Sequence, residues 1–342
     1  MKDKIILGIE SSCDETAIAI IKNDELISNV VSTQISMHQK YGGVMPEVAS
    51  RLHAENITFV LKEALETAKI KLEDVTAIAV TRGPGLIGAL HVGLQTAKTL
   101  SLIYDLPLIP VHHLAAHIYA CEYIKPFKFP MLAIVVSGGN TELVYMKDHL
   151  EFEIIGETKD DAIGECFDKV ARVLGLPYPG GVPIDKLSKT GEHTYQLPTP
   201  LNDNSYNFSY SGLKTSVINL VNHEKMIGNE INVPNLCKSF QDTAINMITT
   251  KVMKAIKEYR VNQVVLAGGV SANSYLRSEM ERLLKNTDVD LILPPIWCTT
   301  DNAAMIAKLG SRLYDVGVRS DLKLSVDPNW RIEDSIKDFK KS

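Results

Sequence analysis

The same succession of predicted strands, tight turns and a helix occurs twice in this 342-residue chain, and this repeat limits the possible folds more than any other feature. In each half, three short strands joined by tight turns precede a helical pattern, at 46–69 in the first half and near 160–174 in the second. The strands are expected at 4–10, 16–22 and 26–33 in the first copy, and at 131–136, 141–147 and 152–157 in the second. The repeat indicates two lobes of similar architecture, whose facing turns would form a phosphate-binding cleft.

Two further units consist of a strand, a glycine-rich turn and a helix. The first has its strand at 75–81, its turn at 82–88 and its helix at 89–104; the second has its strand at 263–267, its turn at 268–273 and its helix to about 285. Alternating strands and helices indicate the α/β class. The segment 177–207, rich in Pro, Gly, Ser and Asn, is expected to be a long irregular loop, and such loops are often functional.

The composition agrees with two buried cores. Apolar residues make up 45% of the chain and charged residues 23%, and no run approaches the ~20 apolar residues of a membrane span. The apolar run Ile5–Ile9 is too short for a signal peptide, so we expect a cytoplasmic protein without a membrane segment. The five cysteines are scattered and form no Cys-x-x-Cys pair, which disfavours a disulfide framework or a thiolate zinc site.

Two histidines, His113 and His117, are spaced so that a helix would project both from one face, where they can share a metal ion. A metalloprotease would need a glutamate directly after the first histidine, and Leu114 stands there instead. Surface or capping histidines would show the same spacing, so the pair alone is a weak signal. It favours a metal site without a protease base.

A third ligand is expected from a distant carboxylate, and Asp301 is the best candidate. It stands just before the helical pattern 303–314, where Asp is also a good N-cap, so the two interpretations are equally favoured. A His, His, Asp set with open positions suits Fe²⁺ or Zn²⁺ and does not decide between them.

Glycine-rich turns after buried strands predict a nucleotide site. Val135 and Val136 end a strand that leads into Ser137, Gly138 and Gly139, where backbone N–H groups can approach a phosphate or acyl oxygen. A plain hairpin would also use such glycines. The turn that ends at Asn273 opens a helix, the setting in which a helix N-terminus accepts a nucleotide.

Several acidic residues have two interpretations. Asp168 and Asp185 could accept hydrogen bonds from ribose hydroxyls or be solvated helix acids, and Gly181 could let the backbone approach a base or simply form a turn. Asp14 and Glu15, in the first hairpin turn, could hold a cation, accept a proton, or only satisfy the turn.

Taken together, these strings resemble the TsaD family, the tRNA N6-adenosine threonylcarbamoyltransferases formerly called glycoproteases. The family lies within the actin, hexokinase and acetate kinase superfamily. The matching strings are 8–16, 41–51, 82–88, the His113 and His117 pair, 137–141, 178–181, 208–215 and 267–273, in that order over nearly the whole chain.

The resemblance implies an actin-like, sugar-kinase-like α/β fold of two duplicated ribonuclease-H-like lobes with a cleft between them. We expect the first lobe at 1–112 and the second, with the metal and adenylate sites, at 113–302; the segment of about 303–335 is a candidate to pack back on the first lobe. A short basic tail at 337–341 without a kinase-like extension resembles the stand-alone bacterial form.

The resemblance also implies residue roles. It implies that His113, His117 and Asp301 bind one metal ion, and that the adenylate lies among Val135, Val136, Ser137, Gly138, Gly139, Asp168, Gly181, Asp185 and Asn273. Asp14 or Glu15 is our candidate for proton removal. The implied reaction moves a threonylcarbamoyl group from threonylcarbamoyl-AMP to N6 of the tRNA adenosine beside the anticodon.

The implied partners are tRNA, a shorter TsaB-like relative of the same fold, and a small TsaE-like ATPase. A net charge of −5 agrees with a chain that needs help to hold tRNA. Two other functions use the same features: an ATP-dependent small-molecule kinase of this superfamily, and a non-catalytic nucleotide-gated scaffold.

Overall fold

The computed structural model describes residues 3–335, so the basic tail at 337–341 lies outside the described residues. The chain divides into two compact units, Met1–Tyr123 with Thr300–Ser342, and Ile124–Thr299. This division differs from the expected boundaries at 112 and 302. It assigns all three candidate metal ligands, His113, His117 and Asp301, to the first unit rather than to the second.

The first unit is built on a five-stranded sheet in the order β3-β2-β1-β4-β5. Its strands are β1 (Ile5–Glu10), β2 (Glu15–Lys22), β3 (Glu25–Thr33), β4 (Ala77–Gly83) and β5 (Leu108–His112). The first three strands form an antiparallel meander, while β4 and β5 run parallel to β1. Because β1, β4 and β5 are parallel neighbours, their carboxyl ends meet at one edge of the sheet.

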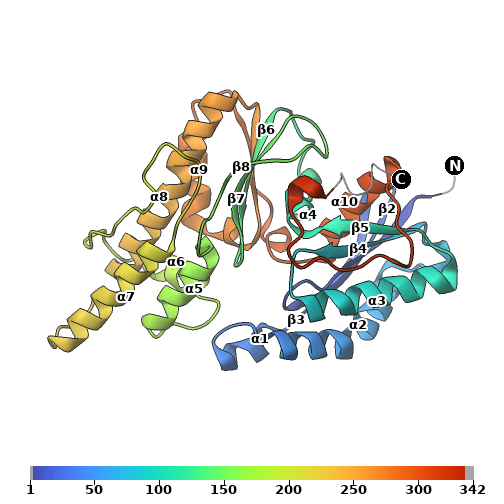
Figure 1. The fold of residues 1–342 in the computed structure, drawn as a ribbon, viewed down its shortest axis with the longest axis horizontal. Coiled ribbons are helices and arrows are strands. Elements are labelled where there is room, and N and C mark those ends of the chain that lie inside the picture. Colours follow the sequence, from blue (N-terminus) through green and yellow to red (C-terminus); the bar gives the residue numbers. More distant parts are fainter. Residues whose placement is uncertain (1–2, 336–342) are drawn as a thin grey trace. The chain divides into compact units, whose positions relative to one another are not determined.

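Helices cover both faces of this sheet (Figure 1). The helices of the first unit are α1 (Ile35–His38), α2 (Pro46–Ala68), α3 (Ile87–Tyr104), α4 (His113–Ala120) and α10 (Ala303–Asp315). On one face, Ile18 and Ile20 of β2 join a core with α2 and α3. On the other, Ala17 and Ala19 pack with the start of α10. The alternation of large and small side chains along β2 therefore lets α10 approach the sheet closely.

The second unit repeats the topology of the first. Its sheet has the order β10-β9-β6-β7-β8. The strands are β6 (Met131–Val136), β7 (Thr141–Met146), β8 (Glu153–Glu157), β9 (Gln263–Ala267) and β10 (Asp290–Ile292). Here β6, β7 and β8 form the antiparallel meander, and β9 and β10 run parallel to β6. The duplication expected from the sequence is confirmed in the strand order.

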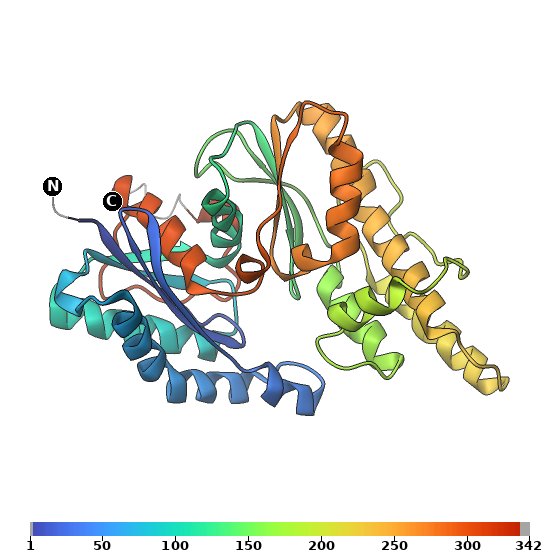
Figure 2. The same ribbon diagram turned by 180° about the vertical axis from the view of Figure 1, so that it is seen from behind.

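Five helices belong to the second unit: α5 (Ile163–Val173), α6 (Gly181–Ser188), α7 (Ser211–Met226), α8 (Val233–Tyr259) and α9 (Ser274–Leu284). Figure 2 shows α8 and α9 side by side, as their contacts confirm. The expectation of a wholly irregular segment at 177–207 was wrong, because it contains α6. The helix is too short for an apolar period to appear in the sequence, and it is stabilised by burying Ile184 in the core.

Short 3₁₀ turns complete the chain at Gln39–Tyr41, Leu72–Asp74, Cys121–Tyr123, Gly269–Ala272, Ile296–Cys298 and Ile332–Asp334. The expected strands and helices are present with ends shifted by a few residues, as is usual for boundaries. Within residues 3–335, no helix combines the length and apolar character that crossing a membrane requires.

Candidate metal centre and nucleotide-binding loops

The two predicted histidine ligands lie on the first turns of α4, which follows β5 directly. Their rings meet edge to face with centroids 4.8 Å apart. The Nε2 atoms of both rings face the same oxygen, Oδ1 of Asp301, at 3.4 Å from His113 and 2.9 Å from His117. The i, i+4 spacing therefore brings both imidazoles to one carboxylate, as the sequence predicted for a shared ion.

Asp301 does not cap α10. The cap is the next residue, Asn302, whose side chain accepts a hydrogen bond of 3.1 Å from the N–H of Met305. The carboxylate of Asp301 is thereby free to turn toward α4. Of the two interpretations that the sequence left open for Asp301, the structure supports the ligand and contradicts the N-cap.

The three side chains fit a divalent cation. One ligand atom from each of His113, His117 and Asp301 lies within 4.8 Å of the others. Two imidazole nitrogens and one carboxylate oxygen suit borderline metals such as Fe²⁺ and Zn²⁺.

Electrostatics at this cluster favour a positive charge. Burial raises the pKa of Asp301, but the neighbouring His113 outweighs burial and brings that pKa below its usual range. Burial lowers the pKa of His113, and the carboxylates of Asp301 and Glu10 outweigh it, so that this pKa lies well above its usual range. Without a metal, His113 is therefore a cation between two carboxylates. A divalent cation would compete with that proton for Nε2.

His112, beside the candidate ligands, has a structural role. Its Nδ1 accepts a bond of 3.3 Å from the N–H of Ala115 at the start of α4, and its Nε2 donates to the carbonyl of Trp330 at 2.8 Å. Burial lowers its pKa to about 3, so the ring is neutral at physiological pH. Both ring nitrogens of His112 are thus engaged in structural hydrogen bonds.

Sequence reasoning missed Glu10, a fully buried residue that ends β1. Its Oε2 lies 3.1 Å from Nδ1 of His113, so the carboxylate contacts the side of the ring opposite to Asp301. The signal was present as a carboxylate at the carboxyl end of a strand that is otherwise entirely apolar. Such a group is costly to bury unless it is paired.

Of the predicted proton acceptors, Asp14 lies in the turn between β1 and β2, and Glu15 is the first residue of β2. Burial raises the pKa of Glu15 well above its usual range, and the charges of Asp301 and Asp14 add to the effect. The hairpin is anchored by His53 of α2, whose Nε2 donates to the carbonyl of Cys13 at 2.9 Å. The structure thus brings Glu15 into electrostatic range of Asp301.

In the second unit, the predicted nucleotide loops follow the neighbouring strands β6 and β9. The side chains of Val135 and Val136 are fully buried, so these residues can meet a ligand only through their backbone. Gly268 has a φ of +87°, and a Cβ there would lie 2.5 Å from the carbonyl oxygen of Val136. Only glycine allows the two strand ends to come so close.

The turn after β6 is open. The hydroxyl of Ser137 accepts a bond of 3.0 Å from the N–H of Asn140, which closes the turn. A Cβ built at Gly138, Gly139 or Gly181 would meet nothing within 4 Å. The backbone at these three glycines can therefore be approached closely by a bound molecule, and their role around the adenylate stays a prediction.

Besides Ser137, three polar residues predicted around the adenylate hold these loops in place. Asp168 accepts a bond of 2.6 Å from the N–H of Gly180, before α6. Asp185 accepts from the hydroxyl of Ser274 at 2.9 Å. Asn273 caps α9 through the N–H of Leu276, and it donates to Gln241 at 2.8 Å. Gln241 is a buried polar residue of α8 that sequence reasoning missed.

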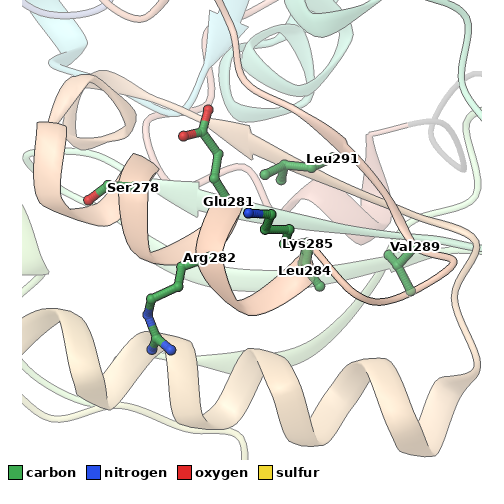
Figure 3. Close-up of a pocket in the computed structure, with 7 residues that line it drawn as sticks. All are labelled: Ser278, Glu281, Arg282, Leu284, Lys285, Val289 and Leu291. Atoms are coloured by element: carbon green, nitrogen blue, oxygen red, sulfur yellow. The ribbon is translucent and has the colours of Figure 1, made fainter.

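The predicted residues thus form two groups. Asp14, Glu15, His113, His117 and Asp301 belong to the first unit, and the residues predicted around the adenylate belong to the second. A separate hollow beside the second half of α9 is lined by Ser278, Glu281, Arg282, Leu284, Lys285, Val289 and Leu291 (Figure 3). Asn273 caps the opposite end of this helix, so the hollow is not part of the loop group.

Comparison with known proteins identifies relatives over almost the whole chain. A family model described as TsaD, tRNA N6-adenosine threonylcarbamoyltransferase, matches residues 25–308. Proteins with that name include one from Bacillus cereus (strain ATCC 10987 / NRS 248), 53% identical over 97% of this chain and 98% of the relative. Another, from Staphylococcus carnosus (strain TM300), is 51% identical over 97% of this chain and 98% of the relative.

Two solved structures are similar in fold. Full-length HypF, in a phosphate- and nucleotide-bound form, has a TM-score of 0.62 and 18% identity, covering 93% of this chain and 56% of that chain. Component A of the (R)-2-hydroxyglutaryl-CoA dehydratase of Acidaminococcus fermentans has a TM-score of 0.54 and 16% identity, covering 91% and 99%. At these identities the likeness concerns the fold alone, and it confirms the predicted actin-like, two-lobed α/β class.

Proposed function

Because the chain belongs to the TsaD family of tRNA N6-adenosine threonylcarbamoyltransferases, we propose that it transfers a threonylcarbamoyl group to tRNA. The donor in this proposal is threonylcarbamoyl-AMP, and the acceptor is N6 of adenosine 37 in tRNAs that read codons beginning with A. The observation that carries the chemistry is the convergence of His113 and His117 on Asp301 in the first unit.

The reaction needs an activated carbonyl and a place for the leaving group. N6 of adenosine attacks the carbamoyl carbon, a C–N bond forms, the C–O bond to the phosphate breaks, and AMP leaves. Open glycine backbone at Gly138, Gly139 and Gly181 suits the adenylate phosphate or the acyl oxygen, because backbone N–H groups can stabilise developing negative charge there.

The cofactor in this proposal is one Fe²⁺ or Zn²⁺ ion held by His113, His117 and Asp301. When bound, it supplies Lewis acidity toward substrate oxygens. The proton that the attacking amine loses goes to a carboxylate, and Asp14 and Glu15 are the candidates. Burial raises the pKa of Glu15, which makes its carboxylate a stronger proton acceptor than an exposed one.

The proposal includes partners. The whole chain carries a net charge of −5, and tRNA binding rests on contacts between Lys or Arg and phosphates. We therefore expect a TsaB-like relative and a small TsaE-like ATPase to assist the tRNA-bound state. The transfer itself consumes the activated donor and needs no ATP hydrolysis.

The test supplies the purified chain with synthetic threonylcarbamoyl-AMP and unmodified tRNA, with and without the two partners. Mass spectrometry of the digested tRNA should show N6-threonylcarbamoyladenosine. A matched tRNA with guanosine at position 37 lacks the N6 amine and should stay unmodified. A phosphorylated small molecule formed from ATP would instead support a kinase, and binding of adenylate without any turnover would support a scaffold.

A further inference from the structure

We propose that Glu10 is a positioning residue of the metal centre: its buried carboxylate fixes the ring of His113 so that Nε2 faces Asp301. This inference rests on the metal site of the proposed function, but it concerns a residue outside the ligand set.

Three groups of the first unit donate to the carboxylate of Glu10. The backbone N–H of Ser12 donates to Oε1 at 2.5 Å, and the hydroxyl of Thr81 donates to Oε2 at 2.6 Å. Nδ1 of His113 lies 3.1 Å from the same Oε2. Glu10 is fully buried, and its ion pair within the described residues is with His113. A buried carboxylate with several donors is held firmly in one orientation.

These contacts determine which nitrogen of His113 keeps its proton when the ring is neutral, as metal binding requires. An ionised carboxylate only accepts hydrogen bonds, so Nδ1 must be the donor. The hydroxyl oxygen of Ser12, 3.2 Å from Nδ1, shares that N–H. When a metal ion displaces the second ring proton, Nε2 offers the lone pair that a cation needs, and it is the atom that faces Asp301 at 3.4 Å. A histidine that binds a metal commonly donates its other N–H to a carboxylate in this way.

The two histidines differ in this respect. Nδ1 of His117 is buried and has no hydrogen-bond partner among the described residues. Glu10 therefore acts on His113 alone. Through the N–H of Ser12, the same carboxylate also holds the start of the turn that carries Asp14. Glu10 therefore links a candidate metal ligand to the turn between β1 and β2.

The experiment compares two variants in the full chain. Glu10→Gln removes the charge while nearly preserving the shape, whereas Glu122→Gln removes a partly buried carboxylate that pairs with Arg312 at 3.0 Å, away from His113. Affinity for Zn²⁺ is measured by competition with a chelator, and folding by thermal melting. We expect Glu10→Gln to bind Zn²⁺ roughly 10–100-fold more weakly and Glu122→Gln to bind like the wild type. Equal affinity in both variants would overturn the proposal.

A second measurement needs no variant. In ¹⁵N-labelled Zn²⁺-loaded wild-type protein, the His113 ring should carry its proton on Nδ1, protected from exchange. A ring with the proton on Nε2 would contradict the role of Glu10 even if Glu10→Gln fails to fold. If the wild type itself retains no Zn²⁺, the metal part of the proposed function fails instead. Transfer to tRNA is measured independently, so the two failures are distinguishable.

Discussion

The two units share one strand order but use the same structural position differently. The last paired residues of the central parallel strands are Ile9 and Val80 in the first unit, and Val135 and Ala267 in the second. The next residues are Glu10 and Thr81 in one case, and Val136 and Gly268 in the other. The first pair exchanges a side-chain hydrogen bond, and the second pair is a close backbone approach.

This difference shows how a duplicated frame acquires two kinds of chemistry. In the first unit, side chains at the strand ends hold a histidine and place carboxylates around it. In the second, the absence of side chains leaves backbone open to a ligand. The strand order sets where ligands can gather, and the residue type at the strand ends decides between side-chain and backbone chemistry.

The largest expected effect concerns the side-chain chemistry of the first unit. Asp301→Asn should lose the metal and reduce transfer to background, because it removes the anionic ligand that faces both histidines. It should also lower the stability of the metal-free protein, since the lowered pKa of Asp301 means that its ionised form stabilises the fold. The neighbouring variant Asn302→Ala should keep the metal and lose only about 1 kcal/mol, the usual value of an N-cap. Metal analysis and urea unfolding measure both; metal retained by Asp301→Asn would refute the assignment.

The second largest effect is expected in the second unit, where the backbone at Gly268 lies close to the carbonyl of Val136. Gly268→Ala should destabilise the protein by about 3 kcal/mol, because the new Cβ meets the carbonyl of Val136 at a positive φ. Gly138→Ala adds a methyl group in open space, so its stability should change by less than about 0.5 kcal/mol while the KM for threonylcarbamoyl-AMP rises. Urea unfolding and steady-state kinetics test the pair. Equal destabilisation by Gly268→Ala and Gly138→Ala would show that the backbone at Gly138 is not open to a bound molecule.

The smallest expected effect sharpens the contrast between the two hairpins. In the first unit, His53 donates to the carbonyl of Cys13 and accepts from the hydroxyl of Thr16 at 2.7 Å. His53→Ala should cost about 2 kcal/mol, since both groups are left without a partner in a buried site. In the second unit, the hydroxyl of Thr141 accepts a hydrogen bond from the backbone N–H of Ile163. A backbone group thus takes the place that the side chain of His53 has in the first unit. An unchanged melting temperature for His53→Ala would contradict this anchoring role.

Much of the secondary structure was predictable from local sequence patterns. The strand pattern, the glycine turns and the long helices Pro46–Ala68 and Ile87–Tyr104 follow from apolar periodicity, which depends on nearby residues alone. The helix at Gly181–Ser188 was missed because eight residues hold too little of a helical period. The return of Ala303–Asp315 to the first sheet was expected only from the family resemblance, since it depends on contacts between distant segments. The boundaries at 112 and 302 were misplaced for the same reason.

In the candidate site, too, some features follow from local sequence and others from contacts between distant segments. By itself, the sequence determined that His113 and His117 share a helix face and that Gly138 and Gly139 form the turn after a buried strand, because both properties depend on neighbours in the chain. Only the tertiary structure decided that Asp301, 184 residues from His117, turns to the histidines and leaves the N-cap to Asn302. It also decided that Glu10 holds His113. Asp and Asn cap helices equally well, so packing between β1, α4 and α10 made the choice.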